Sequence, residues 1–122
     1  MSPNARVIHL ITGEYPPVPG GVADYSRLVA EGLAARGIRV VVWTGPSGDR
    51  RDDAREGVEI RREAGSWTRA DLNRLDGLLD AYPSPRRLLL QFAPNAFHPK
   101  GLNFPLAGWL TRRVRRGDRL RS

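Results

Sequence analysis

Cysteine is absent from the 122-residue sequence, which excludes disulfide bonds, thiolate metal ligands and a cysteine nucleophile. The sequence also has no apolar run of the roughly 18 residues that a membrane-spanning helix requires. Its polar start, MSPNAR, lacks the apolar core of a signal peptide. We therefore expect a single cytoplasmic domain whose functional groups are oxygen and nitrogen atoms.

Lysine is nearly absent as well, because 19 of the 20 basic residues are arginine, and the net charge is +7. Residues 112–121 alone contain six arginines and one aspartate, next to the apolar stretch LNFPLAGWL. Such a segment forms either an ordinary surface helix or a helix peripheral to an anionic membrane. Nucleic acid is a disfavoured partner, because aromatic residues make up only 7% of the chain and are too scattered to stack bases.

Short apolar runs alternate with helical periodicities along the chain. Strands are predicted at residues 6–12, 38–44, 58–62 and 87–92, and helices at residues 23–36, 68–82 and 102–116. The last residues, RRGDRLRS, are similar to the approach to a further strand. Alternating strands and helices predict an α/β fold, a Rossmann-like parallel sheet with flanking helices.

The apolar spacing in two of these helices predicts which residues face the core. In the first helix the predicted inward stripe is Val22, Tyr25, Val29 and Leu33. In the second helix the predicted inward stripe is Leu72, Leu75, Leu78 and Leu79. Thr68 and Asp71 have the spacing of a capping box, which places the start of the second helix.

The segment EYPPVPGGVADY, residues 14–25, joins the first strand to the first helix. Ligands of parallel sheets bind at the carboxyl ends of the strands, and a helix N-terminus favours a phosphate. Gly20 and Gly21 therefore form either a phosphate-binding loop or a tight packing turn. No P-loop and no G-x-G-x-x-G motif is present, so neither a P-loop NTPase nor an ordinary NAD-binding fold is indicated.

Residues 6–45 resemble the opening of the amino-terminal domain in retaining GT-B glycosyltransferases of family four, which reads strand, P-x-x-G-G, helix, strand. Residues 88–110 are similar to a later strand and loop of that family. The resemblance implies transfer of a sugar from a nucleotide-sugar donor to an acceptor with retention, without a metal or other cofactor. It also implies that this sheet is the incomplete first half of a GT-B fold.

The resemblance assigns site residues by position. Gly20 and Gly21 correspond to the loop near the donor diphosphate. The candidates on the acceptor side are Glu14, Tyr15, Asp24, Tyr25, Asn95 and His98. Tyr25 has an alternative interpretation as a core residue. His98 has an alternative interpretation as an exposed residue of a loop. Many relatives have a histidine where this chain has Gln91, Phe92 and Ala93, so no catalytic residue is assigned. His9, inside the first strand, is interpreted as a hydrogen-bonded core residue.

The family's second domain carries the nucleotide-sugar site, with two glutamates eight residues apart, and residues 1–122 show no such domain. We interpret residues 1–122 as a partial acceptor-side domain that transfers no sugar alone and exposes an apolar edge or face of its sheet. A C-terminal domain or a separate complementary chain then supplies the donor site. The alternative is a basic half-domain that binds a membrane surface or a partner without catalysis.

Overall fold

The computed structural model describes residues 7–16, 21–45, 53–55, 57–65, 67–83, 86–91 and 104–121. Six strands form one sheet in the order β3-β4-β2-β1-β5-β6. The strands are β1 (Val7–Thr12), β2 (Arg39–Trp43), β3 (Asp53–Arg55), β4 (Val58–Arg61), β5 (Arg87–Gln91) and β6 (Arg119–Arg121), and the helices are α1 (Gly21–Ala35), α2 (Arg69–Asp80) and α4 (Phe104–Arg115). Five strands are parallel, and β3 pairs antiparallel with β4. The predicted Rossmann-like α/β fold is confirmed.

The predicted strands and helices are all present, with ends that differ by a few residues. Strand β3 was not predicted, because its three residues lie in a polar segment without the apolar pattern of a strand. Pairing with β4 at the edge of the sheet gives this segment its extended structure. Strand β6 occupies the segment that was expected to approach a further strand.

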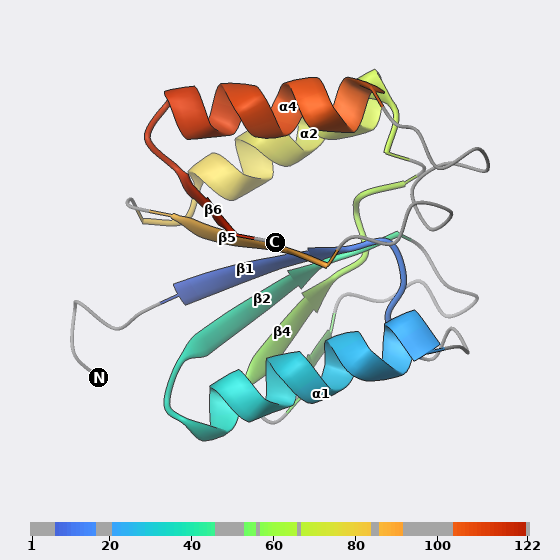
Figure 1. Cartoon of the computed structure of the whole chain (residues 1–122), viewed down its shortest axis with the longest axis vertical. Helices are drawn as coiled ribbons and strands as arrows, with labels where there is room; N and C mark the ends of the chain where they lie inside the picture. The colour runs from blue at the N-terminus through green and yellow to red at the C-terminus, as the bar shows by residue number, and fades with distance from the viewer. Residues whose placement is uncertain are drawn as a thin grey trace.

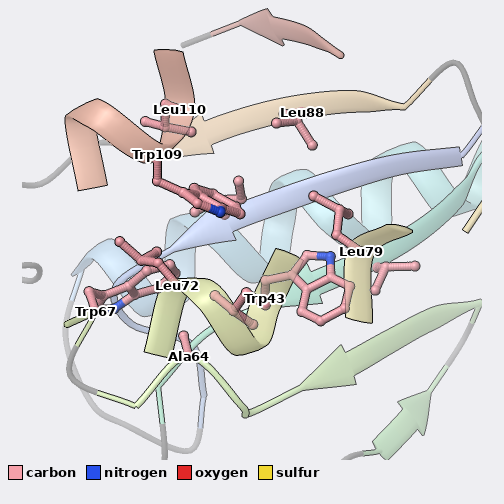
Figure 2. Close-up of a cluster of buried hydrophobic side chains, with 11 residues drawn as sticks. Trp43, Ala64, Trp67, Leu72, Leu79, Leu88, Trp109 and Leu110 are labelled. Atoms are coloured by element: carbon pink, nitrogen blue, oxygen red, sulfur yellow. The ribbon is translucent and has the colours of Figure 1, made fainter. Parts of the chain in front are cut away.

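The helices lie on both faces of the sheet, with α1 on one face and α2 and α4 on the other (Figure 1). Both faces of β1 and β2 are therefore apolar, as a covered parallel sheet requires. On the side of α2 and α4, the three tryptophans Trp43, Trp67 and Trp109 belong to one buried cluster with leucines of α2 (Figure 2). On the side of α1, a second cluster includes Leu10, Tyr15 and valines of β2.

The inward stripe predicted for α2 is confirmed, whereas the one predicted for α1 is only partly right, since Leu33 is half-buried against the cluster on that side and Tyr25 is exposed. Leu72, Leu75 and Leu79 are buried. In α1 the buried residues are Ala23, Ser26 and Ala30. These side chains are small, so they let the helix lie close to β2 and β4, where it packs. The larger apolar residues of the predicted stripe therefore flank the contact, and Tyr25 is 55% exposed.

The capping box at the start of α2 is confirmed. The backbone N–H of Asp71 donates to Oγ1 of Thr68 at 3.2 Å, and the backbone N–H of Thr68 donates to Oδ2 of Asp71 at 3.2 Å. Each side chain thus satisfies a backbone donor that the first turn of a helix leaves open.

Helix α4 is held in place by a buried arginine. Arg113 is fully buried, and its Nε donates to Oδ2 of Asp118, just before β6, at 2.7 Å. Its Nη1 donates to Oδ1 of Asp80 on α2 at 2.8 Å. Trp109 and Leu110 are also buried, in the cluster shown in Figure 2. The apolar face of α4 therefore belongs to the core of the domain.

On the face of α1, β5 and β6 have no covering helix among the described residues. Leu89 of β5 lies on this face beside Leu10 and is half-buried. None of the described helices is long and apolar enough to cross a lipid bilayer.

Candidate functional site

The order of the parallel strands places a switch point between β1 and β5. From β1 the chain moves to β2 and β4 on one side, and later to β5 and β6 on the other. The carboxyl ends of the two central strands are neighbours, since Thr12 pairs with Gln91. Ligands of open parallel sheets bind outside this point. The loop that follows β1 and leads to the N-terminus of α1 leaves the sheet here (Figure 1).

Two buried hydroxyl groups fix the beginning of this loop. Oγ1 of Thr12 donates to the carbonyl oxygen of Glu14 at 2.9 Å, and it lies 3.0 Å from Oγ of Ser26 on α1. Because the Thr12 hydroxyl has one proton, Ser26 is the donor in the second bond. Both side chains are fully buried. The end of β1 and the first turns of α1 are thus joined directly beneath the loop.

The described residues of the loop are also anchored. The Tyr15 side chain is 3% exposed and lies in the cluster on the side of α1. Nη2 of Arg62, the residue that follows β4, donates to the carbonyl oxygen of Pro16. Tyr15 was predicted as an acceptor-side candidate, and the structure places its side chain in the core.

Gly21 is the first residue of α1 and is exposed. A Cβ at this position would have no heavy atom within 4 Å, and its φ is not in the left-handed region. The fold therefore does not require glycine at residue 21. The free N–H groups of the first turn and the positive end of the helix dipole make this position suitable for an anion. Gly20 lies outside the described residues.

The remaining candidates divide into two groups. Asp24 and Tyr25 are exposed on the first turns of α1, and Glu14 is half-buried in the loop, so these three lie near the same edge of the sheet. The alternative that Tyr25 is a core residue is wrong. Asn95 and His98 lie outside the described residues. The acceptor-side roles of all these residues stay predictions.

His9 is a core residue, as predicted. It is fully buried, and its Nδ1 accepts a hydrogen bond from Nε1 of Trp43 at 3.0 Å. Burial lowers the pKa of His9 to about 4, and the nearby Arg86, Arg39 and Arg113 also lower it, against the opposing charge of Asp118. Within the described part of the chain, no group of three histidine, aspartate or glutamate residues could hold a metal ion.

Three residues that hold the loop from the side of the sheet were not among the predicted site residues. Thr12, Ser26 and Arg62 were not singled out. A polar residue at the end of an apolar strand, and a serine among apolar positions of a helix, were available as signals for Thr12 and Ser26. Arg62 had no such signal, because its contact with Pro16 joins residues 46 positions apart.

These features define a doubly wound α/β domain with an exposed helix N-terminus at the switch point of its sheet. The family model of the glycosyl transferase 4-like domain matches residues 20–120. The chain therefore belongs to the glycosyl transferase 4-like domain family. The match confirms the resemblance to the amino-terminal domain of GT-B glycosyltransferases. Searches of curated proteins and of solved structures gave no significant match.

Proposed function

We propose that this chain is the acceptor-side part of a retaining glycosyltransferase that uses a nucleotide-sugar donor. The observation that carries the proposal is the family match over residues 20–120. That range begins at the glycine pair and includes α1, whose N-terminus lies at the switch point of the sheet. A sugar donor and an acceptor follow from the family, and the finer assignments below are our proposal.

Gly20 and Gly21 receive the donor diphosphate. The absence of a side chain at residue 21 leaves the amide groups of the first turn of α1 open to an anion. Backbone donors at a helix end are fixed before the reaction, so they can stabilise the charge that develops on a departing nucleoside diphosphate. This stabilisation needs neither a metal ion nor a protein nucleophile. The acceptor then attacks from the face on which the diphosphate leaves, which retains the configuration.

The acceptor binds against the exposed first turns of α1. Asp24 and Tyr25 are exposed there, and Glu14 is half-buried on the neighbouring loop. Carboxylate and phenol groups can form hydrogen bonds with sugar hydroxyls. Asn95 and His98 are further candidates from the loop that follows β5.

The donor site is completed by a second Rossmann-like domain or by a separate complementary chain in the cytoplasm. Residues 1–122 alone are expected to transfer no sugar. The experiment is to express the longest open reading frame that contains this chain, or this chain with a co-purifying nucleotide-sugar-binding partner. Transfer from a nucleotide sugar, with the anomer determined by NMR, supports the proposal when the configuration is retained. Inverted product contradicts retention, and sustained turnover by residues 1–122 alone contradicts the need for a second part.

Peripheral contact with an anionic membrane is the second candidate, favoured by the exposed Arg112 and Arg115 on α4 and by the exposed Arg116 directly after it. Their attraction to anionic lipid needs no insertion into the bilayer. Trp109 and Leu110 are buried in the core, so they cannot insert into the lipid while the domain is folded. The proposed contact is therefore electrostatic. Such contact would accompany sugar transfer or, in a half-domain without catalysis, replace it.

A further inference from the structure

We infer that Arg62 is a positioning residue that holds residues 14–16 of the loop after β1 and thereby supports the binding of an anionic ligand at the N-terminus of α1. The inference rests on the proposed function for the identity of the ligand. Arg62 belongs to neither the glycine pair nor the acceptor-side candidates. It acts through the main chain of Pro16, to which its Nη2 donates a hydrogen bond.

The backbone on both sides of Arg62 is held by Thr44, the residue that follows the neighbouring strand β2. The N–H of Thr44 donates to the carbonyl oxygen of Arg61 at 3.0 Å, and the N–H of Ala64 donates to the carbonyl oxygen of Thr44 at 3.1 Å. Thr44 is itself 1% exposed, directly after β2. Arg62 therefore extends from a part of the chain that the sheet already fixes.

The segment that follows Arg62 is tightly packed and strained. Gly65 and Trp67 both have positive φ angles, 58° and 60°. A Cβ at Gly65 would lie 2.5 Å from Oδ1 of Asp71, so this position accepts only glycine without rearrangement. A positive φ is unfavourable for tryptophan, but Trp67 is 3% exposed and its burial holds it there. The close packing of Gly65 and the burial of Trp67 thus restrain the chain that follows Arg62.

The side chain of Arg62 lies on the face of the sheet that α1 covers. Val58 and Ile60 are buried on that face, and side chains of an extended segment alternate. Tyr15, the residue before Pro16, is buried in the same cluster. Arg62 is half-buried, and its guanidinium thus reaches the loop near the carboxyl edge of the sheet where α1 begins.

This contact completes a row of three anchors on the loop. Thr12 holds the carbonyl of Glu14, the core holds the Tyr15 side chain, and Arg62 holds the carbonyl of Pro16. Pro16 is five residues before Gly21 and is the last described residue before α1, so the last anchor lies at the point from which the chain continues toward that helix. A preorganised loop avoids the ordering cost that a mobile loop incurs on ligand binding.

Hydrogen exchange of the 122-residue chain tests whether Arg62 holds the loop. Arg62→Met keeps the apolar stem and removes the donors. We expect the amides of Glu14 and Tyr15 to exchange about tenfold faster, as loss of one charged hydrogen bond predicts. Arg62→Lys retains a cationic donor and should restore part of the protection. The control is Arg116→Met, because Arg116 is an exposed arginine whose hydrogen bond goes to Asp80 on α2 and not to the segment around Arg62.

Unchanged exchange at Glu14 and Tyr15 in Arg62→Met would overturn the inference. An equal increase in exchange rate throughout β1 and β2 would also overturn the inference, because it would show that Arg62 stabilises the whole domain and not the loop in particular.

Titration with inorganic pyrophosphate tests the link to the ligand. The backbone amide signal of Gly21 is followed by NMR in the wild-type chain and in the same variants. We expect the dissociation constant to rise about tenfold in Arg62→Met, to recover in part in Arg62→Lys and to stay unchanged in Arg116→Met. Equal affinity of Arg62→Met and the wild type would refute the positioning role. If the wild-type Gly21 signal does not respond, the proposed diphosphate site fails, while the exchange experiment still decides whether Arg62 holds the loop.

Discussion

Trp43 on β2 donates its indole N–H to Nδ1 of His9 on β1 at 3.0 Å, in the interior of the domain. A nitrogen that accepts a hydrogen bond carries no proton, so His9 is neutral and its proton is on Nε2. The ring of Tyr82 lies edge-on to the imidazole, with centroids 5.0 Å apart. This environment has no place for an imidazolium, and burial lowers the pKa of His9 to about 4.

The stability of the protein should therefore fall as the pH drops from 6.5 to 4. In this range the unfolded chain binds a proton at His9, whose ordinary pKa is about 6.5, and the folded chain does not. The free energy of unfolding should decrease by roughly 3 kcal/mol across this window and stay constant above it. Urea denaturation at a series of pH values measures the change.

Two variants assign this pH dependence to its source. In His9→Gln the slope between pH 6.5 and 4 should become much smaller, because glutamine does not titrate. In His98→Gln, which removes the other histidine of the chain, the slope should persist. Equal slopes in the wild type and in His9→Gln would show that another group is responsible.

Arg113 should be far more important for stability than its neighbour Arg116. Both donate to Asp80, but Arg113 is fully buried and the Arg116 side chain is 52% exposed. Arg113→Met leaves the buried Asp118 without one of its cations, which should cost about 3–5 kcal/mol. Arg116→Met removes a surface ion pair, which should cost less than about 1 kcal/mol. Chemical denaturation compares the two, and similar losses would refute this account of the network.

Gly21→Val should impair ligand binding without impairing folding. A side chain at residue 21 meets no neighbouring atom, so the free energy of unfolding should change by less than about 1 kcal/mol. The matched control is Gly32→Val on the same helix, where a Cβ also has nothing within 4 Å. We expect affinity for UDP to fall at least about tenfold in Gly21→Val and to stay unchanged in Gly32→Val. If stability and UDP affinity fall by the same free energy in Gly21→Val, the glycine pair forms a tight packing turn and not a phosphate-binding loop.

The tryptophan fluorescence spectrum should show that the tryptophans are buried in the fold and that they do not insert into membranes. Trp43, Trp67 and Trp109 are the chain's three tryptophans, and none is more than 3% exposed. We expect a blue-shifted emission spectrum that anionic vesicles leave unchanged, even at low salt, where the proposed attraction between the exposed arginines near the end of α4 and the lipid surface is least screened. A vesicle-dependent shift of the spectrum would show that α4 leaves the core.

The elements that the sequence predicted correctly depend on local patterns. The leucine spacing of α2 and its capping box involve residues within one or two turns, so the sequence alone specifies them. The buried face of α1 depends on how closely the helix approaches the sheet. The small Ala23 and Ala30 face the sheet there, whereas the larger Tyr25, which the sequence predicted to face the core, is exposed.

Contacts between distant segments could not be predicted in the same way. Strand β3 exists because β4 lies beside it, and the anchor from Arg62 to Pro16 depends on the order of the strands. The glycine pair was recognisable because strand, loop and helix follow one another directly in the sequence.

The central claim is that the N-terminus of α1 receives the diphosphate of a nucleotide sugar. The most direct measurement is a titration of the ¹⁵N-labelled chain with UDP and, separately, with uridine, followed by NMR. The account predicts that UDP shifts the amide signals of Gly20, Gly21 and Val22, and that uridine, which lacks the diphosphate, does not. Equal shifts with both compounds, or UDP-dependent shifts confined to other parts of the chain, would contradict it.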